Sequence, residues 1–157
     1  MIDWALVERL SLEARRQLVL LVAMVILRNK EGVLDAMYAL SGRPGKGVIE
    51  AEVTRFFERL RPGDSPGALD AMRLLDETAL AGVHFPSSLF FFRKSIFTLD
   101  GVLQDVAGSP VRIDYVILRE FLTRCLGSFG MFHAPLELRD FAAMEWNALL
   151  LPARWIS

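Results

Sequence analysis

The chain has 157 residues and a formal net charge of −1, with 18 Lys and Arg against 19 Asp and Glu. This length suits one domain with a sizeable core, and the balanced charge excludes a broad basic surface, so we expect no nucleic-acid partner. Apolar residues make up 53% of the chain, against the roughly 45–50% that is usual in soluble domains. We therefore expect a partner to cover part of the surface.

Hydrophobic residues recur at helical spacing, which predicts an all-α fold, a single helical domain of about seven helices over residues 1–157. Residues 1–10 are expected to form a strand or loop, with Met1 to Trp4 as the strand candidate, and 11–150 to hold the helices. The expected helices are Leu12–Asn29, Lys30–Ser41, Val48–Leu60, Ala68–Ala81, Ser87–Ala107, a sixth between the cap Asp114 and Gly127, and Pro135–Leu150.

The first of these helices is predicted to lie at the centre of the fold. Ser11 is placed to cap it, because a serine hydroxyl accepts a hydrogen bond from an otherwise unpaired amide. The run from Leu18 to Leu27 is apolar on all sides, but it is shorter than the ~20 residues needed to cross a bilayer. Because the single cysteine forms no internal disulfide and no secretory signal is evident, we expect a cytoplasmic location, with peripheral membrane association as the alternative.

Three later helices carry specific expectations about burial. In helix 48–60, Glu52 is expected on the water-facing side. Helix 68–81 is expected to bury Leu80, while the neighbours Asp76 and Glu77 form a solvated edge. The consecutive residues 90–92 are all Phe, and they point in three directions at about 100° per residue. Helix 87–107 is therefore expected to be wrapped by neighbours or by something outside this chain.

Most motifs of a kind that can carry chemistry are better explained by a structural role. The loop Gly42 to Gly47 resembles a phosphate cradle in composition, but the spacing, hydroxyl and preceding strand of a Walker loop are missing, so we expect a connector. His84 and His133 lie far apart, and neither belongs to a metal-binding cluster. Cys125 is expected to be a buried, inert thiol.

The N-terminal segment contains the one candidate metal ligand. Asp3 follows a short apolar stretch and precedes Trp4 and Ala5, which is how kinases place the carboxylate that binds Mg²⁺. That metal neutralises charge on the phosphate oxygens during transfer. Taken alone, the tripeptide also matches any surface Asp after two apolar residues.

The surrounding residues resemble the UbiB/AarF family of atypical kinase-like proteins. The Asp-Trp-Ala tripeptide precedes Leu10-Ser11 and a long helix with paired Arg15-Arg16. A second block contains Gly82-Val83-His84-Phe85-Pro86, then Leu89, Arg93-Lys94 and Leu99-Asp100-Gly101-Val102. The resemblance covers about Ile2 to Val106 and fades towards Ser157.

This resemblance implies the C-terminal lobe of a kinase-like fold that uses ATP and Mg²⁺, is linked to ubiquinone or other isoprenoid-lipid metabolism, and is usually membrane-associated. Only Asp3 matches a functional position of the family, as a magnesium ligand. Ala5 and Glu8 stand where the family commonly has glycines, and a Cβ at Ala5 restricts the backbone. The family's nucleotide loop, ATP-contacting Lys and catalytic loop would precede Met1, so we expect no catalysis and no bound ATP or Mg²⁺ for this chain alone.

Two hypotheses of function follow. The first is a truncated, split or separately expressed UbiB/AarF-like lobe, whose partner is the missing N-terminal kinase-like lobe or another chain. It predicts apolar faces on helices 12–29 and 87–107 that this lobe, self-association or a membrane surface would cover. The second is a self-contained helical protein-interaction or regulatory module, with a closed core, a partner groove and no nucleotide binding. An enzyme of another class has no identifiable nucleophile, base or metal cluster to support it.

Overall fold

A computed structural model of the protein describes residues 10–42, 45–107, 140 and 142, and no strand occurs within these ranges. It contains helices α1 (Leu12–Ile26), α2 (Lys30–Ser41), α3 (Lys46–Arg59), α4 (Ala68–Leu80) and α5 (Ser87–Ala107). The all-α expectation is thus confirmed for the described part of the chain. The strand candidate and the sixth expected helix lie outside the described residues, as does the last helix except for Asp140 and Ala142, which are helical.

Local capping explains where the first two helices begin and end. The Oγ atom of Ser11 accepts a hydrogen bond from the amide of Ala14 at 3.1 Å, which confirms the expected cap of α1. This helix ends three residues earlier than predicted, because Arg28 adopts a left-handed backbone with φ of 49° and Asn29 caps α2 through the amide of Gly32. An asparagine cap satisfies an amide that the helix itself leaves unpaired.

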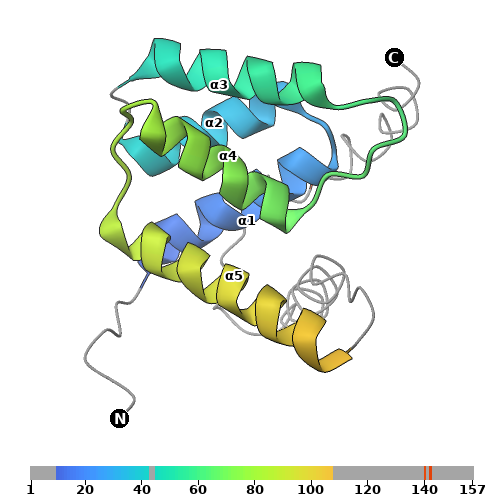
Figure 1. Ribbon diagram of the computed structural model, residues 1–157. Helices are drawn as coiled ribbons and strands as arrows, with labels where there is room; N and C mark the ends of the chain where they lie inside the picture. The colour runs from blue at the N-terminus through green and yellow to red at the C-terminus, as the bar shows by residue number, and fades with distance from the viewer. Residues whose placement is uncertain (1–9, 43–44, 108–139, 141, 143–157) are drawn as a thin grey trace.

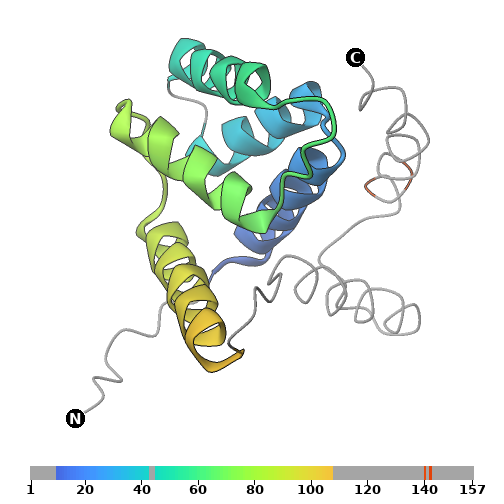
Figure 2. The same cartoon turned by 45° about the vertical axis from the view of Figure 1, so that its right-hand side comes forward.

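The first four helices enclose one core. Helix α1 packs against α2 and α4, and α3 packs against the same two helices, so the contacts form a closed ring. Figures 1 and 2 show α5 along one side of this group, with its C-terminal end pointing away from α1–α4 in both views. The fully buried larger side chains are Leu21, Val25, Val33, Met37, Ile49, Val53, Met72, Leu74 and Thr78. Two of them belong to α1, as its predicted central position requires.

Several burial predictions are wrong, each for an identifiable reason. Leu80 is 89% exposed, because at about 100° per residue it lies half a turn away from the buried Ala71. Glu52 is buried, and both of its carboxylate oxygens accept hydrogen bonds from Arg55 at 2.7 Å. Adjacent acidic residues 76 and 77 pair with Arg93 of α5 and Arg59 of α3, respectively, while their side chains stay partly exposed, so the expected solvated edge is met in part.

Candidate functional site

The predicted magnesium ligand, Asp3, lies outside the described residues, as do Cys125 and His133. His84 is exposed. Among the residues that the structure describes, no group of three or more His, Cys, Asp or Glu side chains is placed to hold a metal ion. Within the same ranges, no helix is long and apolar enough to cross a membrane.

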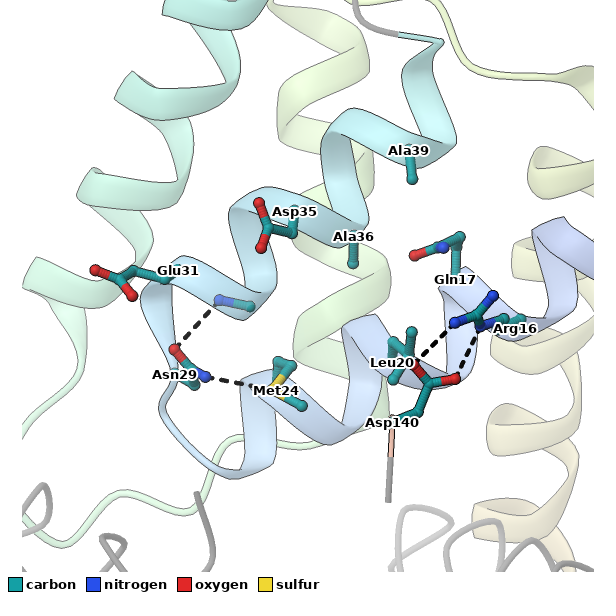
Figure 3. A pocket seen from close by; sticks show the side chains of 11 residues that line it. Arg16, Gln17, Leu20, Met24, Asn29, Glu31, Asp35, Ala36, Ala39 and Asp140 are labelled. Carbon is teal, nitrogen blue, oxygen red and sulfur yellow. Dashed lines mark hydrogen bonds and ion pairs between the residues drawn. The ribbon is translucent and has the colours of Figure 1, made fainter. Parts of the chain in front are cut away.

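A pocket of about 460 Å³ opens between α1 and α2 (Figure 3). Its size falls within the range of about 300–1,000 Å³ that is typical of small-molecule sites. The lining combines apolar and polar side chains, and all but one of them come from these two helices and the turn between them. The lining residues are Arg16, Gln17, Leu20, Met24, Asn29, Glu31, Gly32, Asp35, Ala36, Ala39 and Asp140.

A buried ion pair forms part of the pocket wall. Arg16 donates from Nε to Oδ2 of Asp140 at 2.8 Å and from Nη2 to Oδ1 at 2.9 Å, a two-point contact visible in Figure 3. Arg16 is 9% exposed and Asp140 is 7% exposed. The two residues are 124 positions apart, so the contact ties α1 to a distant part of the chain. The fork of a guanidinium matches the two oxygens of a carboxylate, which makes this geometry specific for arginine.

The other end of the pocket depends on a glycine. The amide of Gly32 bonds to the cap Asn29, whose Nδ2 atom donates to the sulfur of Met24 at 3.5 Å. A Cβ atom on Gly32 would lie 2.6 Å from Cγ of Met24, and that methionine is itself buried. Gly32 therefore allows α2 to approach α1 closely.

The charge of this pocket argues against a phosphate-bearing ligand. Asp140 neutralises Arg16, which leaves Glu31 and Asp35 as the remaining charged residues of the lining. Glu31 lies in the first turn of α2, whose positive dipole end favours a carboxylate. The described pocket is therefore acidic.

An exposed apolar face on α5 is the second notable surface. Phe90, Phe91 and Phe92 are between 36% and 39% exposed, and Val102 is also exposed. Leu89, in the same turn of the helix, is buried in the core and anchors α5 there. Within the described residues, neighbours do not cover this helix on all sides, and the alternative expectation, that something outside this chain covers it, stays a prediction.

The matching expectation for α1 is largely wrong. Its apolar residues Leu18, Leu21, Met24 and Val25 are buried in the core, and Leu12 at its first position, at 59%, is the one large hydrophobic of α1 that is exposed. The sequence pattern of α1, apolar on all sides, therefore reflects a central helix and not a surface left open for another lobe.

The second block that carries the family resemblance is a structural joint between α4 and α5. Gly82 has a φ of 101°, a left-handed conformation that glycine adopts without a steric penalty. Val83 is buried, and Pro86 stands directly before the first residue of α5. Arg93 pairs with Asp76 of α4 and lies 5.9 Å from the centre of the Phe97 ring.

The expected connector at residues 42–47 leads to a polar cluster at the start of α3. Gly42 ends α2 with a φ of 67°, and Lys46 lies over the ring of Tyr38 at 5.6 Å. The hydroxyl of Tyr38 donates a hydrogen bond to Glu50 at 2.8 Å. This arrangement places the cation of the loop on an aromatic ring, so the described part of the loop has a packing role.

Burial and the bond to Glu50 raise the pKa of Tyr38 from 10.0 to about 12. The neutral phenol therefore stabilises the fold fully below pH 10, and this contribution is lost as the pH rises through about 12. We expect a tyrosinate absorbance titration of Tyr115→Phe, which leaves Tyr38 as the only tyrosine, to show the raised pKa. Adding Glu50→Gln should move this pKa back towards its ordinary value, and an unchanged titration would contradict the assignment.

Comparisons with protein-family models, with curated proteins and with solved structures found no match.

Proposed function

We propose that this chain is the C-terminal helical lobe of a UbiB/AarF-like atypical kinase, which acts only together with a nucleotide-binding part. The proposal is supported by the structural roles of residues that belong to the resemblance. Ser11 caps α1 shortly after the Asp-Trp-Ala tripeptide, and Arg16 forms the buried ion pair. The block from Gly82 to Arg93 sets α5 against α4.

In this proposal, Asp3 would contribute one carboxylate ligand to Mg²⁺ at the entry to α1. The metal would bridge phosphate oxygens of ATP, which is the chemistry for which such a carboxylate is needed. Everything else that positions a nucleotide would come from the other lobe. The acidic pocket between α1 and α2 has no part in this site.

A second candidate function, a self-contained helical interaction module, is favoured by the closed ring of α1 to α4. Such a core needs no second lobe to cover α1. The two candidates differ in their response to a nucleotide-binding lobe. An interaction module would not bind that lobe.

The experiment is co-expression of the tagged chain with the nucleotide-binding part of a UbiB/AarF-like protein that lacks its own C-terminal lobe. We expect the two to co-purify as a stable complex. The isolated chain should show no change in thermal unfolding with millimolar MgATP, whereas the complex should unfold at a higher temperature when MgATP is added, because a ligand stabilises the state that binds it. Failure to form a complex with correctly folded partners would contradict the proposal.

A further inference from the structure

One outward stripe of α5 has a pattern that suits a second copy of the same helix. Six exposed residues recur along it at helical spacing: Phe91, Lys94, Thr98, Gly101, Val102 and Asp105. At about 100° per residue they lie on one side of the helix, opposite the buried Leu89 and the partly buried Arg93 and Ile96. The stripe thus faces away from the core to which α5 is anchored.

The charges of this stripe are self-complementary. Lys94 lies towards the N-terminal end of the stripe and Asp105 at its C-terminal end. The two residues are about 16 Å apart along the helix axis, at a rise of 1.5 Å per residue. A two-fold axis beside the middle of α5 relates the two copies and makes every contact occur twice. If a residue of the first copy faces a given position of the second, the same residue of the second copy faces that position of the first. When two copies of α5 run antiparallel, Lys94 of each copy therefore faces Asp105 of the other.

The same register also places the uncharged residues of the stripe favourably. Thr98 of each copy faces Gly101 of the other, so small residues lie where the two helices are closest. Small residues suit this position, because the axes of packed helices are only about 8–10 Å apart. Val102, the other exposed apolar residue of the stripe besides Phe91, lies one residue beyond Gly101. The C-terminal half of α5 projects away from α1–α4 (Figure 2).

We propose that the chain forms a two-fold dimer through antiparallel packing of the outward stripes of α5, with Lys94 and Asp105 forming one ion pair at each end. The dimer goes beyond the proposed function, because it uses neither Asp3 nor nucleotide. Exposed ion pairs contribute little affinity by themselves, so their part is to set the register, and the exposed Phe91 and Val102 add apolar surface to the contact.

Sedimentation equilibrium of the full chain over the micromolar range tests this dimer. Lys94→Glu places like charges together at both symmetric positions and should weaken the dimer roughly tenfold, as should Asp105→Lys. The double variant Lys94→Glu/Asp105→Lys restores opposite charges and should recover most of the affinity. Lys30→Glu, the same charge change at an exposed position of α2, serves as the matched control and should leave association unchanged.

Circular dichroism of each variant checks that the helical fold is retained. A folded wild-type chain that stays monomeric at every concentration would overturn the proposal. So would a dimer that the single variants do not weaken, or that the double variant fails to restore. Binding of the monomer to vesicles of phosphatidylcholine and phosphatidylglycerol through Phe91 and Val102, without dimer formation, would assign the stripe to a membrane surface instead. None of these results depends on MgATP, so the dimer and the kinase-lobe proposal fail independently.

Discussion

Arg16→Ala is expected to destabilise the protein by about 3–5 kcal/mol, because it leaves the carboxylate of Asp140 buried without its guanidinium. Both residues are more than nine-tenths buried, so water cannot replace the lost contact without local opening. Urea unfolding should show a lower midpoint with a similar slope. Arg15→Ala, the same change at the exposed neighbouring position of α1, should lower stability by less than about 0.5 kcal/mol.

The double variant Arg16→Met/Asp140→Leu separates charge from packing. Replacing a buried ion pair by apolar residues of similar volume is often neutral or stabilising, by up to about 1–4 kcal/mol. We therefore expect the double variant to be clearly more stable than Arg16→Ala. Equal stability of the two variants would contradict the explanation that Arg16→Ala is destabilised by the unpaired, buried carboxylate of Asp140.

Leu21→Ala is expected to cost about 3–5 kcal/mol, since Leu21 is fully buried in the middle of α1 and its removal leaves a cavity. Leu12→Ala is the matched control, because Leu12 belongs to the same helix and is 59% exposed. Its substitution should have an effect within about 0.5 kcal/mol. Comparable losses in the two variants, measured by urea unfolding, would contradict the central position of α1.

Helical periodicity and caps predicted the first five helices well. Ser11, Gly42 and Pro86 mark boundaries that the structure retains, because such signals act within a few residues of the backbone that they satisfy. The end of α1 was missed, since the left-handed turn at Arg28 depends on packing: its Nη2 atom donates to the carbonyls of Arg61 and Asp64, far along the chain.

Long-range pairing accounts for contacts that the sequence did not predict. Asp76 and Glu77 look solvated by composition, but each has an arginine partner on another helix, whereas the buried Glu52 pairs with Arg55, three residues along its own helix. The ion pair of Arg16 with Asp140 joins positions 124 residues apart, and no local sequence pattern predicts it. Helical periodicity indicates which side of a helix is apolar, whereas it carries no information on which charged residue of another helix lies opposite.

The most direct test of the kinase-lobe proposal is MgATP binding by the complex between this chain and a nucleotide-binding lobe, measured through thermal unfolding with wild-type chain and with Asp3→Asn. The account predicts that MgATP stabilises the wild-type complex, that Asp3→Asn abolishes most of this effect, and that Asp35→Asn, the same change at an exposed residue of α2, leaves it intact. An equal response to MgATP with and without the Asp3 carboxylate would contradict the account.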